Sequence, residues 1–284
     1  MVKLVTVIGH GTNLIPHFIN HYRGQVDEIC FAVYVTEKYP NIETEVKEII
    51  KDYNDVKIVL TFNDRIYDWN KVTQMYNYVK SKEKNIWWVV ADIDEFHLYP
   101  KSIREIVSDC ESNNWDMVRG GFIDRIGPNG IFPKIMNLIS IWSQFPNAGF
   151  FRYIMSNACP NKVCLMRGYV EITSGQHYAK LDGQTTWKWQ GWNHPLIAPI
   201  ETHSVQVHHF KWDETSIERV LDVANIKQDY SYSDEYEIMY KELKKNNFKI
   251  DLKNKDYMFE EGITQPDFNR YKNWNKLIKK IISI

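Results

Sequence analysis

Short apolar runs and amphipathic segments alternate through the first half of the chain. The apolar runs are rich in β-branched and aromatic residues, as is typical of buried strands, and they lie at residues 4–9, 29–35, 56–60 and 86–91. The amphipathic segments carry apolar residues at helical spacing, and they lie at residues 15–22, 43–52, 68–81 and 100–110. Repeated β-α-β units predict an α/β fold in which helices flank a mostly parallel central sheet.

The second half has a less regular pattern. Strand-like runs at residues 117–124, 163–166 and 204–209 are separated by loop-rich stretches, the first of which contains four prolines. From Thr215 onward the pattern is polar and helical. We therefore divide the chain into a main α/β domain of residues 1–212 and a helical C-terminal extension of residues 213–284.

Composition narrows the classes of protein to which the chain can belong. The 284 residues are 44% apolar and 25% charged, and the formal net charge of −1 gives no reason to expect a nucleic-acid partner. No apolar segment approaches the ~20 residues that cross a bilayer, and the N-terminus has the pattern of a strand rather than of a signal peptide. The four cysteines are scattered, so we expect reduced thiols and a cytoplasmic protein.

An acidic cluster directly follows the fourth predicted strand. In the string WWVVADIDEF, residues 87–96, the apolar run ends in Asp92, Asp94 and Glu95. Neighbouring carboxylates raise one another's pKa, and a shared divalent cation such as Mg²⁺ or Mn²⁺ relieves the repulsion. Open α/β sheets also bind ligands at the carboxyl ends of their strands, so the cluster predicts a metal site at that edge. The alternative is that the acids only begin the next helix, whose dipole favours them.

Several segments resemble one enzyme family. Asp92-Ile93-Asp94 resembles the Asp-x-Asp motif of nucleotide-sugar glycosyltransferases with the GT-A fold, and DIDEF is similar to the D-x-D-E-F variant of the family 2-related group. Four further segments resemble that group in the same order along the chain: HYRGQVDEICFAVYV (21–35), WNKVTQMYNYV (69–79), GFIDRIGPNGIFP (121–133) and VHHFKW (207–212). The resemblance implies a GT-A, Rossmann-like fold. It also implies transfer of a hexose-like sugar, with inversion, from a UDP or GDP donor to a hydroxyl of a glycan or other acceptor.

The resemblance also implies roles for the acidic residues. Asp94 is expected to bind Mn²⁺ or Mg²⁺ directly, while Asp92 reaches the ribose of the nucleotide, or the ion through water. Such an ion bridges the diphosphate oxygens and stabilises the charge that develops as the glycosidic bond breaks. Glu95 is expected either to support these ligands or to cap the next helix.

A late histidine is expected to complete the metal site, because many GT-A enzymes have one. His208 and His209 are adjacent in a predicted strand, so they face opposite sides and at most one points into the site. His209 fits the His-aromatic pattern of the family better. The alternative is a histidine that packs among the nearby aromatic residues, because a metal ligand needs a neutral imidazole and fixed outer partners.

The loops after the first three strands are predicted to form the nucleotide pocket. Gly9 and Gly11 follow the first strand, where backbone amides can approach a ligand closely. Glu37 follows the second strand, and Asp64, after the third, can accept from a ring N–H of uracil or guanine. Lys71 lies on the helix before the acidic cluster and can contact the nucleotide. Each of these residues, taken singly, also fits an ordinary loop or surface position.

An inverting transferase needs a base near the acceptor hydroxyl, and the resemblance implies a carboxylate. Asp182 lies in a loop with glycine and tryptophan that suits an acceptor, whereas Asp124 precedes an arginine with which it can form a structural ion pair. We keep both as candidates, prefer Asp182, and retain Glu171 as a further option.

His177 lies shortly after Gly175 in SGQHYA and is expected near the sugar or phosphates of the donor, or else makes only a local hydrogen bond.

The C-terminal segment NRYKNWNKLIKKIISI is amphipathic and basic. It predicts a helix that packs on its own domain or on a second subunit of an oligomer, or else peripheral contact with a membrane surface.

Two other functions remain open. One is a metal-dependent nucleotidyltransferase, although the loop HGTN lacks the lysine and glycine spacing of a phosphate loop. The other is a non-catalytic carbohydrate-binding protein that retains the fold.

Overall fold

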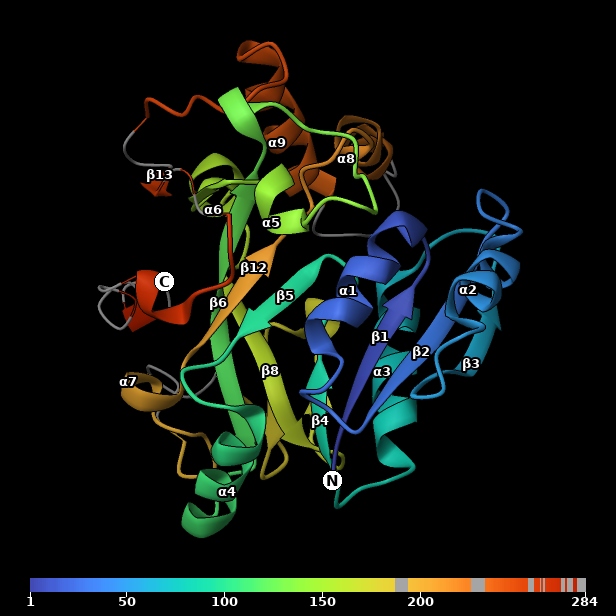
Figure 1. Cartoon of the computed structure of the whole chain (residues 1–284), viewed down its shortest axis with the longest axis vertical. Helices are drawn as coiled ribbons and strands as arrows, with labels where there is room; N and C mark the ends of the chain where they lie inside the picture. The colour runs from blue at the N-terminus through green and yellow to red at the C-terminus, as the bar shows by residue number, and fades with distance from the viewer. Residues whose placement is uncertain are drawn as a thin grey trace. The chain divides into compact units, whose positions relative to one another are not determined.

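The chain is described from a computed structural model that covers residues 1–186, 194–225, 233–254, 258–260, 262, 264–271, 274 and 278–279. Its elements are labelled in Figure 1. The chain forms two compact units, the first of residues 1–121, 161–207 and 268–284, and the second of residues 122–160 and 208–267. The second unit thus combines a mid-chain stretch with most of the predicted C-terminal extension, whereas the sequence pattern suggested one boundary after Trp212.

The described residues form these strands: β1 (Val2–Ile8), β2 (Glu28–Val35), β3 (Val56–Asn63), β4 (Trp87–Val90), β5 (Glu95–Leu98), β6 (Met117–Ile126), β7 (Asn147–Gly149), β8 (Asn161–Arg167), β9 (Glu171–Ile172), β10 (Ala179–Leu181), β11 (Gln184–Thr185), β12 (Val205–His209) and β13 (Met258–Glu260). They form these helices: α1 (Ile15–Tyr22), α2 (Ile42–Ile50), α3 (Trp69–Ser81), α4 (Ile103–Asn113), α5 (Ile141–Gln144), α6 (Phe151–Ser156), α7 (Ile200–His203), α8 (Ser216–Asn225) and α9 (Ser233–Lys245). Short 3₁₀ turns include η1 (Thr12–Leu14) and η3 (Ser174–Gln176).

A sheet with a parallel part dominates the first unit. Its strands lie in the order β8-β4-β1-β2-β3; β1 is parallel to β2 and β4, β2 is parallel to β3, and β8 is antiparallel to β4. Helices α1 and α2 cover one face and α3 covers the other (Figure 1). Right-handed crossovers require this arrangement, because the chain reverses its direction along the sheet after β3. The predicted α/β class with flanking helices is confirmed, and antiparallel strands extend the parallel part.

The hydrophobic pattern predicts the packing of α3 well. Its expected inward residues, Val72, Met75, Tyr76 and Val79, are all buried. The helix begins after Asp68, whose carboxylate accepts the backbone N–H of the second helical residue at 2.7 Å. The buried face and the capping residue therefore both come from local sequence.

Two local predictions need correction. The helix expected from Pro100 begins at Ile103, because Ser102 and Glu105 form a capping box in which each side chain binds the other residue's backbone N–H. Glu95 does not cap a helix, since it is the first residue of β5. The acidic cluster therefore does not begin a helix, so a favourable helix dipole does not explain its three carboxylates.

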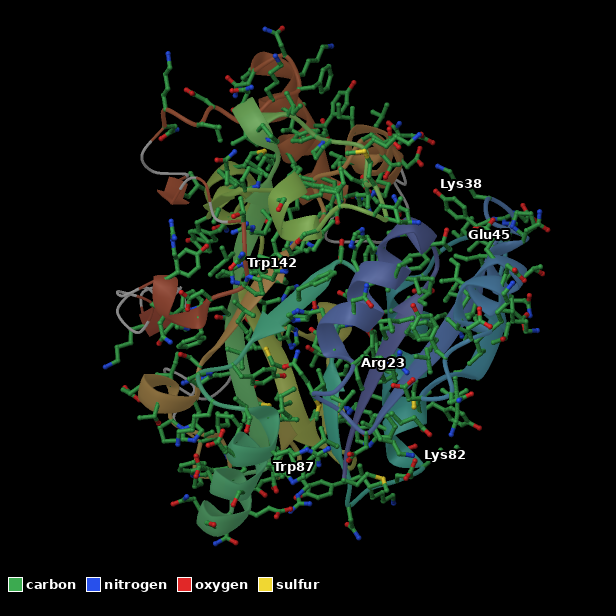
Figure 2. All side chains as sticks on the ribbon, viewed as in Figure 1. Arg23, Lys38, Glu45, Lys82, Trp87 and Trp142 are labelled. Atoms are coloured by element: carbon green, nitrogen blue, oxygen red, sulfur yellow. The ribbon has the colours of Figure 1, made fainter. Side chains whose placement is uncertain are left out.

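The second unit has its own core. The end of β6 pairs with β7, and β7 pairs with β13, both antiparallel. Helices α6, α8 and α9 share a buried cluster that includes Phe151, Trp212 and Met239. On β6, the guanidinium of Arg125 lies 5.1 Å from the ring centre of Trp142, which Figure 2 labels. Helices α8 and α9 follow Thr215 as the polar helical pattern predicts, whereas β13 is a strand that the pattern did not predict.

No helix in the described ranges is long and apolar enough to cross a membrane. Most of the segment predicted as a basic C-terminal helix lies outside the described residues.

Candidate functional site

The loops predicted to bind the nucleotide share one edge of the parallel strands. The chain builds outward from β1 through β2 and β3 and then returns to the other side of β1 as β4, so the strand order reverses between β1 and β4. Ligands of open α/β sheets bind at such a reversal, outside the carboxyl ends of the strands. A methyl group built on Gly11 would lie 3.6 Å from Cγ2 of Ile93. The loop after β1 therefore adjoins the acidic motif at this point.

The acidic motif is held by hydrogen bonds from two other elements. Asp94 is 8% exposed, and the side chain of Asp92 is 30% exposed. Asp92 Oδ1 accepts the Tyr76 hydroxyl at 2.7 Å, and Oδ2 accepts the Lys162 ammonium at 3.0 Å. Burial acts to raise the pKa of Asp92, but Lys162 and Tyr76 outweigh burial, so the pKa lies below its usual value. Asp92 is therefore an ionised carboxylate in a fixed orientation.

Lys162 is the site residue that the sequence pattern did not reveal. It is the second residue of β8, and β8 is antiparallel to β4, so the start of β8 lies beside the end of β4. Its ammonium lies 2.6 Å from Oε1 of Glu95, and both side chains are 1% exposed. Lys162 and Asp92 are 70 residues apart in sequence, and no local motif marks the lysine. Only the pairing of β4 with β8 brings it to the motif.

The residues present fit a cation that is bound together with a donor's phosphates. Within the described ranges, no three His, Cys, Asp or Glu side chains gather into a group that could hold an ion. Mg²⁺ in nucleotide-using enzymes is usually held by one or two carboxylates plus substrate phosphates and water, which is the donor set that Asp92 and Asp94 offer. Lys162 offsets one of the motif's three negative charges, so the charge that remains still suits a divalent ion.

Gly9 is explained by the packing of the loop after β1 against the loop between β3 and α3. A Cβ atom at Gly9 would lie 2.4 Å from Cε2 of Tyr67, so the tyrosine ring fills that space. Gly11 has φ 71°, in the left-handed region that favours glycine. The next residue, Thr12, donates to Glu45 of α2 at 3.1 Å, and Figure 2 labels that glutamate. The two glycines therefore shape the loop, and their contact with a nucleotide stays a prediction.

The other predicted nucleotide contacts lie at the same edge. Asp64 accepts the Tyr34 hydroxyl at 3.2 Å. Glu37 is exposed, and its backbone N–H donates to the loop that follows β3 at 3.3 Å. The Lys71 ammonium lies 5.9 Å from the ring centre of Phe62. Tyr34 fixes the carboxylate of Asp64, whereas the positions of Glu37 and Lys71 also suit ordinary surface residues.

His177 lies in a turn that is joined to the acidic motif. Its Nδ1 lies 2.7 Å from the carbonyl oxygen of Asn161, and because a carbonyl only accepts, Nδ1 carries the proton. The preceding residue, Gln176, donates from Nε2 to Asp92 Oδ1 at 3.2 Å. The structure therefore brings the turn of His177 to Asp92, and contact of either residue with a donor stays a prediction.

In the second unit, His209 pairs with Asp124. Nδ1 of His209 lies 3.4 Å from Oδ1 of Asp124, and the two residues are 5% and 1% exposed. Asp124 also accepts Trp212 Nε1–H at 3.2 Å and the Arg152 amide at 2.9 Å. Burial acts to raise the pKa of Asp124, but His209 and Arg152 outweigh burial and lower it. A carboxylate that orients a histidine is the outer partner that metal-ligating histidines have, whereas these same bonds disfavour Asp124 as a base.

Asp182 lies at the tip of the hairpin between β10 and β11. Asp182 and Gly183 have φ 48° and 72°, the two positive values of a type I′ turn. The Asp182 side chain is 67% exposed and lies 3.3 Å from Nε2 of His194. His194 Nδ1 accepts the Leu196 amide, so in the neutral ring Nε2 carries the proton. The neighbouring tryptophans lie outside the described residues: Trp187, Trp189 and Trp192.

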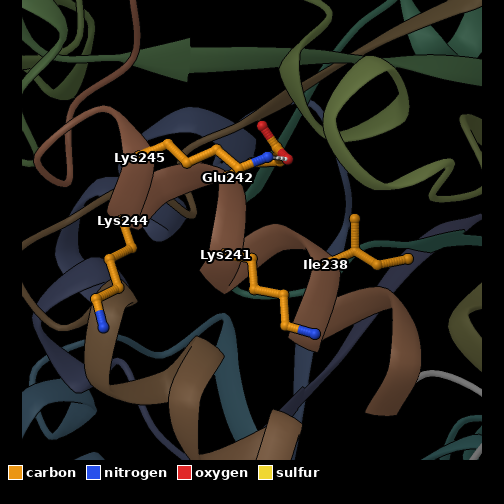
Figure 3. A pocket seen from close by; sticks show the side chains of 5 residues that line it. All are labelled: Ile238, Lys241, Glu242, Lys244 and Lys245. Carbon is orange, nitrogen blue, oxygen red and sulfur yellow. Dashed lines mark hydrogen bonds and ion pairs between the residues drawn. The ribbon is translucent and has the colours of Figure 1, made fainter.

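A hollow on the surface of α9 is unrelated to the predicted site (Figure 3). It is lined by Ile238, Lys241, Glu242, Lys244 and Lys245, with an ion pair between Lys245 and Glu242. None of the residues predicted for the donor, metal or base lines it.

Comparison with known proteins finds only distant likeness. No protein-family model matches the chain, and no curated protein matches it. Similar solved structures include a protein provisionally described as a glucose-1-phosphate thymidylyltransferase from Bacillus anthracis, in complex with sucrose (10% identity, 47% of this chain and 59% of that chain, TM-score 0.27). Others are mannose-6-phosphate isomerase from Helicobacter pylori (11%, 77% and 88%, 0.31) and UDP-glucose pyrophosphorylase with UDP-glucose (10%, 53% and 67%, 0.26). Likeness at this level assigns no activity.

Proposed function

We propose that this chain is a metal-dependent glycosyltransferase that moves a sugar, with inversion, from a UDP- or GDP-type donor to an acceptor hydroxyl. The observation that supports it is the position of the acidic motif. Asp92 and Asp94 follow β4 directly, at the reversal of strand order and beside the loop of Gly11. The resemblance of DIDEF to the D-x-D-E-F group suggests that the carboxylates at this position bind the metal and the nucleotide sugar.

The charged residues have separate roles in this proposal. Asp94 and Asp92 would hold Mn²⁺ or Mg²⁺ together with the donor's phosphates. A metal-binding role for His209, whose ring is held by Asp124, stays a prediction from the resemblance. A bound divalent ion would stabilise the charge of the leaving diphosphate. Lys162 keeps Asp92 ionised and fixed.

Asp182 is the proposed base that takes the proton of the acceptor hydroxyl. Its carboxylate is exposed, so an acceptor can reach it, and Nε2 of His194 lies 3.3 Å from it. Asp124 is the weaker candidate, because its oxygens already accept from a histidine, a tryptophan and a backbone amide.

The test is thermal stabilisation by UDP, GDP and CMP, each with and without Mn²⁺. We expect one nucleotide to raise the melting temperature only when the metal is present. Asp94→Asn should weaken metal–nucleotide binding at least about tenfold, since it removes a direct ligand. Asp52→Asn, which neutralises an exposed carboxylate just after α2, is the matched control and should bind as the wild type does.

Other outcomes would replace the proposal. Stabilisation by a nucleoside triphosphate, with release of pyrophosphate from a triphosphate and a sugar phosphate, would indicate a nucleotidyltransferase. Stabilisation by oligosaccharides but by no nucleotide would indicate a carbohydrate-binding protein. If one nucleotide stabilises the protein only in the presence of metal, a screen of nucleotide sugars for hydrolysis identifies the donor.

A further inference from the structure

The start of β8 joins two parts of the site that lie far apart in the sequence. Asp92 follows β4, and His177 follows the η3 turn, far along the chain. Asn161 and Lys162, the first two residues of β8, contact both parts. This strand end is therefore the structural link between the acidic motif and the η3 turn.

Lys162 forms most of that link. Its ammonium lies 2.6 Å from Glu95 Oε1, 3.0 Å from Asp92 Oδ2 and 3.1 Å from the Gly175 carbonyl oxygen, and it also donates to the side-chain oxygen of Gln176. The side chain is 1% exposed. An ammonium has three protons to donate, so these four acceptors use its full capacity. Two acceptors belong to the motif and two to the turn.

The turn needs outside contacts to keep its shape. Gly175 and Gln176 have φ 71° and 52°, and a non-glycine residue in that region persists only where its surroundings fix it. Gln176 is 2% exposed and connects the η3 turn to Lys162 and Asp92. Its Oε1 accepts from Lys162, and its Nε2 donates to Asp92. Asn161 holds His177 through its carbonyl oxygen at 2.7 Å.

We propose that Lys162 is a positioning residue of the donor site, which ties the acidic motif to the η3 turn so that Asp92 and His177 meet the donor as one preformed unit. The inference rests on the proposed function for the identity of the donor. A preformed site loses less conformational entropy on binding than a site that must first become ordered. The link is therefore expected to raise affinity for the metal–nucleotide complex. Lys162 acts through Asp92 and the turn and is not assigned a contact with the donor.

The test compares two buried lysines of the same unit. Lys162→Met removes the ammonium that bonds the motif, whereas Lys80→Met removes a buried amine that donates to the Val170 carbonyl, outside the motif and the turn. We expect Lys162→Met to weaken Mn²⁺–nucleotide binding at least about tenfold in calorimetry, and Lys80→Met to stay within about twofold of wild type. Hydrogen exchange at residues 173–178 should accelerate in Lys162→Met alone. Equal losses in both variants, or a folded Lys162→Met with wild-type affinity, would overturn the proposal.

A second variant covers the case in which Lys162→Met does not fold. Gln176→Leu keeps the bonds of Lys162 to Asp92, Glu95 and the Gly175 carbonyl but removes the two side-chain bonds of Gln176, to Lys162 and to Asp92. It should weaken nucleotide binding and accelerate exchange at residues 173–178, and unchanged values of both would overturn the proposal. If wild-type protein binds no nucleotide with any metal, the proposed function fails. The exchange comparison then decides the Lys162 link by itself.

Discussion

Lys80 offers a quantitative test of the packing beneath the site. It lies on α3 with no exposed surface, and its ammonium donates to the Val170 carbonyl at 2.5 Å. Burial lowers the pKa of Lys80 from 10.5 to about 7, although nearby Glu171 acts in the opposite direction. The folded protein thus releases this proton far below the pH at which the unfolded chain does.

The sign of the effect on stability follows from proton binding. Between about pH 7 and pH 10 the unfolded chain keeps the Lys80 proton and the folded protein does not, so wild-type stability rises with pH in this window. The slope is about 1.4 kcal/mol per pH unit, and the total is about 4–5 kcal/mol. Below pH 7 both states hold the proton and the burial cost is constant. Lys80→Met removes this dependence, together with a hydrogen bond worth about 1 kcal/mol.

The assay is urea denaturation of wild type and Lys80→Met from pH 6 to pH 10, under reducing conditions. We expect the variant to be the more stable protein at pH 6, and its advantage to shrink steadily as the pH rises above 7. Lys82→Met, at the exposed residue directly after the same helix (Figure 2), is the control and should follow the wild-type curve. Parallel curves for wild type and Lys80→Met would refute the burial of a charged Lys80.

Three further substitutions test the site. Asp124→Asn replaces an ionised acceptor of His209 and should cost about 2 kcal/mol in urea denaturation; a loss below about 0.5 kcal/mol would contradict the hydrogen bonds seen at this carboxylate. Gly9→Ala forces the Tyr67 ring to move and should cost about 1–3 kcal/mol, so an unchanged melting temperature would show that the two do not touch. Asp182 lies in an exposed turn, so Asp182→Asn should change the free energy of unfolding by less than about 0.5 kcal/mol. If Asp182 is the base, the same change should lower turnover by at least about 100-fold, and normal turnover would exclude that role.

Much of the first unit follows from local sequence. Helix α1 has the bounds that the apolar pattern predicts, and α3 begins one residue later than expected because Asp68 is its cap. The parallel order of β1, β2 and β3 follows from the β-α-β alternation. The sequence predicts the place of the acidic motif because a strand and the residues that follow it are contiguous in the chain.

The partners of the site residues could not be found in the same way. Glu95 begins a strand that follows the motif directly, where the acidic composition suggested a cap. Asp124 and His209, assigned separately as a base and a ligand, are joined by a contact across 85 residues. Such contacts depend on which strands become neighbours, and periodicity within a segment carries no information about that.

The sequence by itself thus determined the α/β class, the buried faces of the helices and the place of Asp92 and Asp94 at the end of a strand. These features depend on side-chain spacing and on caps within a few residues, so a single chain reveals them. Only the tertiary structure decided what balances the motif's charge. Lys162 reaches Asp92 and Glu95 because β8 lies antiparallel beside β4, and a buried ammonium at that point is stable only with both carboxylates around it.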